Sequence, residues 1–237
     1  MPIMERTATI MAMQTTAVPR RTAGFRKIVI NGAIASALLA AFYAASMLLE
    51  RQGLELDNES VWYAIRASGA VAYLLLAAST AWGILLSGKL VKRRVPAALA
   101  LELHTILSWT AIGMSVYHAY LLLFSRFFDY TVVDLLVPFV GPYEPLAVGL
   151  GIVGLYLMIL TSASFYLIDR IGYRSFRQVH YLTYIAYVLA TVHSVLAGSD
   201  GLLFNPVYVA VSAGLFLLTL ARILARRPHA PRRIYTS

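Results

Sequence analysis

The sequence contains no cysteine and few charged residues. None of its 237 residues is Cys, and only 13% are Asp, Glu, Lys or Arg, against about 25% in a typical soluble domain. Without cysteine the chain has no disulfides, no thiolate metal sites, no iron–sulfur clusters and no covalent c-type haem attachment. The low charge excludes an ordinary soluble domain, and any metal centre here must use other ligands.

Hydrophobic residues make up 59% of the chain and are concentrated in six long runs. Each run reaches the roughly 20 residues that cross a hydrocarbon core of about 30 Å. The expected spans are 27–49, 61–87, 97–124, 146–168, 175–197 and 203–224. The sequence therefore predicts an all-α fold, an integral membrane six-helix bundle over residues 27–224. Residues 1–26, which lack a cleavable signal pattern, are expected to form a disordered cytoplasmic arm, and residues 225–237 a basic cytoplasmic tail.

The basic residues lie almost entirely on one side of this topology. Of the 20 Lys and Arg residues, 17 lie on the same side of the six-span topology. They come before the first span, in the second and fourth loops, or in the end of the chain from Arg222 onward. The exceptions are Arg51, Arg66 and Arg126. The positive-inside rule therefore predicts that both termini are cytoplasmic. The net charge of +9 indicates orientation and contact with membrane lipids, with no nucleic-acid partner. We expect a multi-pass protein of a bacterial inner membrane.

Four of the five histidines lie in two of the predicted spans. His104 and His118 are 14 residues apart in the third span, and His180 and His193 are 13 apart in the fifth. An ionisable side chain inside a bilayer is costly and indicates a functional site. At 1.5 Å per residue, each two-histidine segment covers about 20 Å of helix. Both spans run outward, so His104 matches His180 at the inner level and His118 matches His193 at the outer level.

Helix phase agrees with this pairing in one span and not in the other. A separation of 14 residues leaves two side chains on nearly the same face of an ideal helix, whereas a separation of 13 does not. His104 and His118 therefore share a face, but His180 and His193 would diverge. We expect a bulge or kink between Tyr181 and Val192 that corrects the difference.

Two histidines at each level suit haem better than zinc. Zinc usually takes four protein ligands, or three and a water, whereas a bis-histidine haem needs two ligands and a broad apolar slot. We therefore interpret the pairs as ligands of two haems in an electron-transfer protein. Two alternatives from other classes remain: a haem-free transporter that uses the histidines as a proton relay, and a membrane scaffold in which they are core residues.

The spacing H-x13-H in the third span and H-x12-H in the fifth resembles the ferric reductase-like transmembrane domain. That superfamily includes ferric-chelate reductases, NADPH oxidases and the haem-binding membrane subunit of a bacterial methionine-sulfoxide reductase system. The resemblance covers roughly residues 62–224. It implies that His104, His118, His180 and His193 are axial ligands of two b-type haems and that electrons flow outward. The sulfoxide-reductase subunit is the alternative within the family, but it generally lacks one histidine of the third span.

The resemblance also bears on the partners. Eukaryotic members carry a C-terminal domain for FAD and NADPH, whereas here only about 13 residues follow the sixth span. The expected donor is a separate cytoplasmic flavoprotein reductase, a soluble flavin or a quinol. The expected acceptor is a ferric chelate, oxygen or an outer-face redox partner. Whether the protein is an enzyme depends on that donor, and no catalytic residue is assigned.

Three arginines are added to the predicted cofactor sites. Arg66 lies just inside the outer end of the second span, where its guanidinium would pair with a propionate of the outer haem; snorkelling to the interface is the alternative. Arg174 and Arg177 precede His180. They are expected to serve the inner propionates, to contact lipid, or to dock the donor.

Two further segments have predicted structural roles. Residues 132–139, in the third loop, form a short apolar segment that is expected to lie at the outer interface. Its role is either to cap the outer haem and gate access for an acceptor or simply to pack on the membrane surface. Gly149, Gly151 and Gly154 match G-x-G-x-x-G, but a nucleotide fingerprint requires a preceding strand. Because these glycines lie inside an apolar span, we expect them to serve close helix packing.

Overall fold

The computed structural model describes residues 58–87, 95–198 and 201–225, and these are helical with no strand among them. The predicted arm, the first predicted span and all but the first residue of the predicted tail lie outside these ranges. The longer helices are α3 (Asn58–Leu86), α5 (Ala97–Leu121), α7 (Pro145–Ser164), α8 (Ile168–His180), α9 (Leu182–Ala197) and α10 (Gly201–Leu224). The shorter ones are η1 (Leu122–Phe124), α6 (Val132–Leu136) and η2 (Phe165–Leu167).

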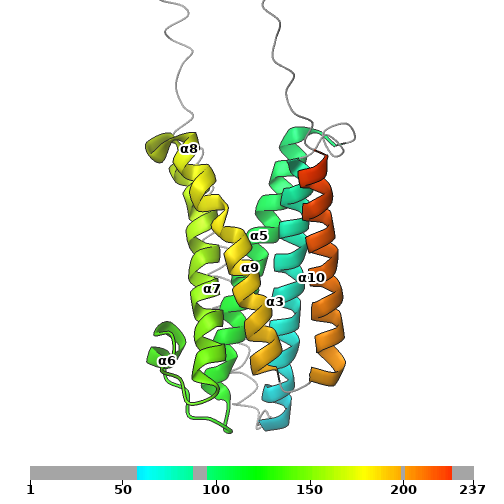
Figure 1. The fold of residues 1–237 in the computed structure, drawn as a ribbon. Helices are drawn as coiled ribbons and strands as arrows, with labels where there is room; N and C mark the ends of the chain where they lie inside the picture. The colour runs from blue at the N-terminus through cyan, green and yellow to red at the C-terminus, as the bar shows by residue number, and fades with distance from the viewer. Residues whose placement is uncertain (1–57, 88–94, 199–200, 226–237) are drawn as a thin grey trace, which may run out of the picture. The chain divides into compact units, whose positions relative to one another are not determined.

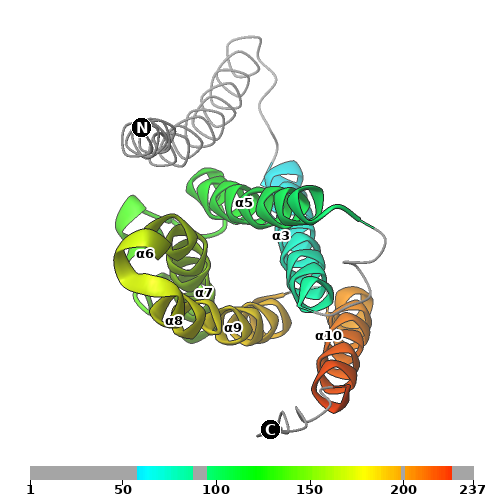
Figure 2. The same ribbon diagram turned by 90° about the horizontal axis from the view of Figure 1, so that it is seen from above.

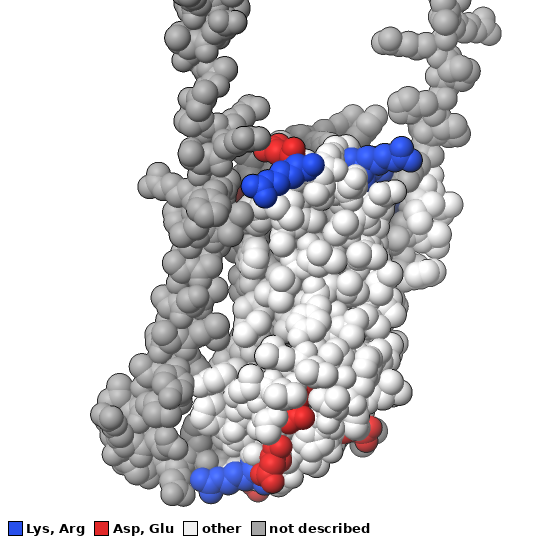
Figure 3. All heavy atoms as spheres, turned by 90° about the vertical axis from the view of Figure 1, so that its left-hand side faces the viewer, with Lys and Arg blue, Asp and Glu red and all other residues white. Residues whose placement is uncertain are grey.

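Four helical stretches of the described chain are long and apolar enough to cross a membrane. They are Asn58–Leu86, Ala97–Phe124, Pro145–Ala197 and Phe204–Leu224. On the face shown in Figure 3, charged side chains gather at the two ends and leave an uncharged belt between them. Such a belt is what a hydrocarbon core requires. The chain is therefore a multi-pass helical membrane protein, and the predicted boundaries of spans two, three and six agree with the helices to within three residues.

The long stretch Pro145–Ala197 doubles back on itself. After α7 ends, the backbone at Gly172 turns away from helical geometry, with φ 77° and ψ 157°. Glycine adopts this positive φ without the clash that a Cβ would cause. α7 and α9 then lie side by side (Figures 1 and 2). The predicted spans 146–168 and 175–197 correspond to α7 and to the end of α8 with α9.

The long helices form two close pairs with α10 alongside. α3 packs along α5, α7 packs along α9, and α10 lies against α3 and α9 (Figure 2). Contacts between the two pairs are sparser and join α3 to α9 and α5 to α7. The core that joins the pairs is centred on Tyr73, Ala111 and Ala186, of which both alanines are fully buried. The α3/α5 pair and the α7/α9 pair thus face each other with this core between them.

Candidate functional site

The four histidines of the helices form two facing pairs. His104 of α5 faces His180 at the end of α8, with ring centroids 6.1 Å apart and planes at 79°. His118 of α5 faces His193 of α9, with ring centroids 6.2 Å apart and planes at 73°. These are the pairs that the depth argument predicts. Each pair joins one histidine from the α3/α5 side to one from the α7/α9 side.

The distance between the rings leaves room for one metal atom in each pair. A metal–imidazole bond is about 2 Å long, and the ring centre lies about 1 Å behind the coordinating nitrogen. Two axial imidazoles on one metal therefore have centroids about 6 Å apart. No group of three or more His, Cys, Asp or Glu residues in the described ranges is placed to hold a metal ion. Each pair thus offers two imidazoles, which fits axial ligation of haem better than a zinc site.

Backbone carbonyls of neighbouring helices orient the His118/His193 pair. Nδ1 of His118 lies 2.7 Å from the carbonyl oxygen of Ile65 in α3. Nδ1 of His193 lies 2.9 Å from the carbonyl oxygen of Ala147 in α7. A carbonyl only accepts, so both Nδ1 atoms must carry the proton and donate it. Nε2 of each ring then keeps its lone pair for a metal, as in ligating histidines generally.

The His104/His180 pair has weaker polar support. Nδ1 of His104 lies 3.5 Å from Oγ of Ser79, and that hydroxyl is also 2.7 Å from Oγ of Ser108. Nδ1 of His180 is buried and makes no hydrogen bond, although the Thr161 backbone is near enough to interact with the ring. Phe176 stacks on the His180 ring at 5.3 Å and 26°.

Three glycines let the imidazoles lie directly against α3 and α7. A Cβ at Gly69 would lie 2.9 Å from Cε1 of His118, and one at Gly151 would lie 2.8 Å from Nδ1 of His193. At Gly83 the Cβ would lie 3.1 Å from Cε1 of His104. Any side chain at these positions would displace the ring. Gly83 is a site residue that the sequence analysis missed, although its 14-residue distance from Gly69 repeats the spacing of the α5 histidines.

The G-x-G-x-x-G segment serves close packing, as predicted. Gly149 admits Phe139, whose Cδ1 would lie 2.2 Å from an added Cβ. Gly154 faces the backbone and side chains of α9 around Ala186. Gly151 adds a role beyond helix packing, because its neighbour is the ring of His193.

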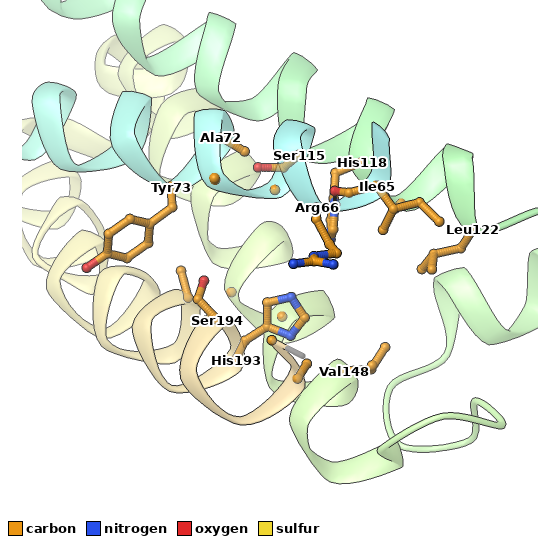
Figure 4. A pocket seen from close by; sticks show the side chains of 18 of the residues that line it. Ile65, Arg66, Ala72, Tyr73, Ser115, His118, Leu122, Val148, His193 and Ser194 are labelled. Carbon is orange, nitrogen blue, oxygen red and sulfur yellow. Dashed lines mark hydrogen bonds between the residues drawn. The ribbon is translucent and has the colours of Figure 1, made fainter. Parts of the chain in front are cut away.

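A cavity of about 1450 Å³, counting its open mouth, surrounds the His118/His193 pair. Arg66, His118 and His193 point into it (Figure 4). Its lining is otherwise mainly apolar and aromatic, and includes Trp62 and Met158. The guanidinium of Arg66 also lies 5.8 Å from the centre of the Tyr63 ring. The structure therefore brings Arg66 to the same cavity as this histidine pair.

The loop after α5 lies over this cavity. Within the predicted interfacial segment 132–139, residues Val132–Leu136 form α6, whose first turn is capped by a reciprocal hydrogen-bonded box between Thr131 and Asp134. Leu135 and Tyr130 line the cavity. Burial raises the pKa of Tyr130 to about 12, so this phenol stays protonated at neutral pH. The loop thus contributes a neutral wall to the cavity.

The structure does not bring Arg177 toward the His104/His180 pair. Its guanidinium donates a hydrogen bond of 2.9 Å to the Tyr181 hydroxyl and lies 5.8 Å from the ring centres of both Tyr173 and Tyr181. Arg174 is also exposed on α8. Both arginines are therefore surface groups in this structure, which suits contact with lipid or a partner better than contact with a buried carboxylate.

The predicted irregularity in the fifth span lies at Tyr181. α8 ends at His180 and α9 begins at Leu182. The Thr183 hydroxyl donates to the His180 carbonyl at 2.6 Å, and the Tyr184 amide donates to the Tyr181 carbonyl at 3.2 Å. This tight turn separates α8 from α9 within the predicted interval, and both His180 and His193 face histidines of α5.

No family model, curated protein or solved structure matches this chain. The resemblance to ferric reductase-like domains therefore rests on the histidine spacing of the sequence alone.

Proposed function

We propose that this protein is a dihaem b-type membrane cytochrome of the ferric reductase-like kind. It would carry electrons from a cytoplasmic-side donor to an acceptor at the outer face. The observation that carries the proposal is the pair of facing imidazoles at each of two levels, with ring centroids 6.1 and 6.2 Å apart. In this proposal the chain crosses the membrane six times with both termini inside. His104/His180 is then the inner pair and His118/His193 the outer pair.

The residues present fit a haem at the outer level. His118 and His193 would be its axial ligands, since Nδ1 of each is committed to a carbonyl. The cavity around them supplies an apolar slot, and Arg66 within it would bind a carboxylate of the cofactor. When bound, the haem supplies a one-electron couple whose potential depends on its axial ligands and on burial.

At the inner level, His104 and His180 would hold the second haem. The helices of the α3/α5 and α7/α9 pairs keep the two levels about 20 Å apart. Between the levels the chain excludes water with a buried core that includes Tyr73 and Leu76. With two histidines holding each haem, the group would supply one-electron transfer to an acceptor that does not bind its iron.

The donor would meet the inner end of the bundle. α8 presents Arg174 and Arg177 there as exposed side chains, and exposed arginines suit an acidic flavoprotein surface. A membrane quinol is the other donor class that this topology allows. The acceptor, whether a ferric chelate, oxygen or an outer-face partner such as a sulfoxide reductase, would meet the opposite end.

The test is the haem content of the full-length protein purified in detergent. We expect a b-type dithionite-reduced minus oxidised spectrum and about two haems per chain by pyridine haemochrome. The His104→Ala and His118→Ala variants should each retain about one haem per chain. His229→Ala is the matched control, because this histidine lies outside the predicted spans, and it should retain both. A wild-type protein without haem, expressed with adequate haem supply, would contradict the proposal and favour the haem-free proton relay or scaffold.

A further inference from the structure

The partners of the four histidines recur at a fixed interval along α3 and α7. Ile65 and Ser79, which face Nδ1 of His118 and His104, are 14 residues apart. Each is followed four residues later by the glycine that admits the same ring, Gly69 or Gly83. Because four residues are about one helical turn, the polar partner, which is the Ile65 carbonyl or the Ser79 hydroxyl, and the glycine stand one above the other and form a cradle for the ring.

α7 contains this cradle once in full and once incompletely. Ala147 supplies the carbonyl to His193, and Gly151 follows four residues later. The next repeat begins at Thr161, near His180, and the glycine position is occupied by Phe165. The regular helix ends there, since Phe165 begins η2.

An aromatic contact replaces the missing cradle beside His180. The ring of Phe165 lies 6.1 Å from that of Phe176, and Phe176 stacks on His180. This contact fills space around the imidazole, but it offers no acceptor to Nδ1, which is buried without a hydrogen bond. The Thr161 backbone lies near the His180 ring, but Nδ1 makes no hydrogen bond within the described residues that would fix the rotation of the ring before a ligand binds.

The two levels consequently differ in how far they are organised in advance. Both outer imidazoles donate to carbonyls, at 2.7 and 2.9 Å. At the inner level, Nδ1 of His104 lies 3.5 Å from the Ser79 hydroxyl, which also contacts Ser108. Nδ1 of His180 makes no hydrogen bond within the described residues. Partners behind a ligating histidine typically change metal affinity by about 10- to 100-fold, and a ligand fixed in advance loses less entropy on binding.

Building on the proposed function, we infer that the two haem sites are not equivalent: the outer site is the permanent one and the inner site is exchangeable. The outer haem binds first during assembly and leaves last. The inner haem is gained and lost on a pre-existing scaffold. The chain would thus have a one-haem form with His118 and His193 occupied.

The test is the rate at which each haem leaves the purified dihaem protein. Excess apomyoglobin is added in detergent, and haem transfer is followed by absorption. We expect two phases of equal amplitude whose rates differ by about tenfold or more. The single haem of His104→Ala should leave at the slow rate and that of His118→Ala at the fast rate. A single phase in the wild type, or the opposite assignment in the variants, would overturn the inference while leaving the dihaem proposal intact.

A second variant tests the polar support directly. Ser79→Ala removes the hydroxyl beside His104 and should accelerate only the fast phase, with a change in the ferric low-spin EPR signal of that haem. Thr80→Val is the matched control, because this neighbouring hydroxyl donates to the Leu76 carbonyl of its own helix at 2.8 Å; it should change neither phase. Acceleration of the slow phase by Ser79→Ala would contradict the assignment. A wild-type protein without haem would instead refute the proposed function itself.

Discussion

At the scale of single residues, the hydrogen-bond partner of each imidazole determines which ring nitrogen is left as an acceptor. An imidazole inside a membrane can be a core group, a proton carrier or a ligand. At His118 and His193 a carbonyl takes the Nδ1 proton, so the other nitrogen is left as a lone-pair donor. Glycine then brings the ring against the helix that supplies the carbonyl.

Gly69→Ala should displace the His118 ring. The added Cβ would lie 2.9 Å from Cε1 of His118, and the ring must move away from its carbonyl partner. We expect loss of about one haem per chain, or about tenfold weaker retention of it, measured by pyridine haemochrome after apomyoglobin challenge. Gly113→Ala is the control, since its Cβ would meet nothing within 4 Å. Equal retention in both variants would show that the close approach at Gly69 has no effect.

Arg66→Gln should lower the reduction potential of the outer haem. A unit charge about 10 Å from the iron, at an effective dielectric constant of about 20, is worth about 1–2 kcal/mol. Its loss favours the oxidised state by some tens of millivolts. Potentiometric titration of the haem absorption band measures the shift. Arg126→Gln is the control, because it removes the same charge from an exposed position. It should shift neither haem potential by a comparable amount. Equal shifts in the two variants would contradict a specific contact between Arg66 and the outer haem.

At the scale of elements, the irregular segments matter most. A turn at Tyr181 separates α8 from α9, and His180 and His193 both face α5 although they are 13 residues apart. Gly172 reverses the chain between α7 and α9. α6 lies beside the cavity and is too short to be stable by itself, so its cap has a large share in keeping it ordered.

The order of α6 should depend on pH through Asp134. Hydrogen bonds from the Thr131 hydroxyl and backbone amide lower the pKa of this carboxyl. A carboxyl with a lowered pKa in the folded state stabilises that state above its unfolded pKa of about 4. The contribution is lost as the pH falls through the lowered value. Hydrogen exchange across residues 131–137, corrected for intrinsic rates, should therefore show less protection at about pH 3 than at about pH 6.

Asp134→Asn is the control for this pH dependence, because an amide does not titrate in this range. The variant should show similar protection of residues 131–137 at both pH values. A wild-type segment equally protected at both, or a variant with the same pH response, would contradict the role of the carboxylate.

At the scale of the whole described bundle, two helix pairs are held at a fixed separation by a polar cluster in the middle. The Tyr73 hydroxyl of α3 lies 2.6 Å from the Tyr187 hydroxyl of α9 and 2.9 Å from Ser212 Oγ of α10. Tyr73 stands about halfway between Ile65 and Ser79 along its helix. The cluster therefore lies between the two histidine levels and constrains both.

Tyr73→Phe should weaken both levels together. It removes the hydroxyl that joins three helices and leaves partners buried, at a cost of about 1–3 kcal/mol. We expect the midpoint of thermal unfolding to fall by about 2–4 °C per kcal/mol, and both phases of haem loss to accelerate. Thr219→Val is the control, since its hydroxyl bonds only to Leu215 of the same helix at 2.8 Å. Acceleration of a single phase would show that the cluster supports one level only.

Much of the described fold could be predicted from the sequence. An apolar run in lipid must satisfy its backbone hydrogen bonds within itself, so it forms a helix. This determined the second, third and sixth spans, and the spacing of His104, His118, His180 and His193 determined which histidines face each other. The separate short segment within residues 132–139 and the break at Tyr181 also followed from local pattern, whereas the capping of a haem by that segment stays a prediction. The first span and the side on which each terminus lies stay predictions.

Only the tertiary structure decided what supports each histidine. The carbonyl behind His118, the role of Gly83 and the unbonded Nδ1 of His180 depend on how helices are rotated and registered against one another. Ile65 and His118 are 53 residues apart, and no local pattern relates a backbone carbonyl to a side chain at that distance. Sequence pattern likewise did not show that the Arg177 guanidinium donates a hydrogen bond to the Tyr181 hydroxyl. Sequence pattern determined where the four histidines lie, and helix packing determined which groups support each ring.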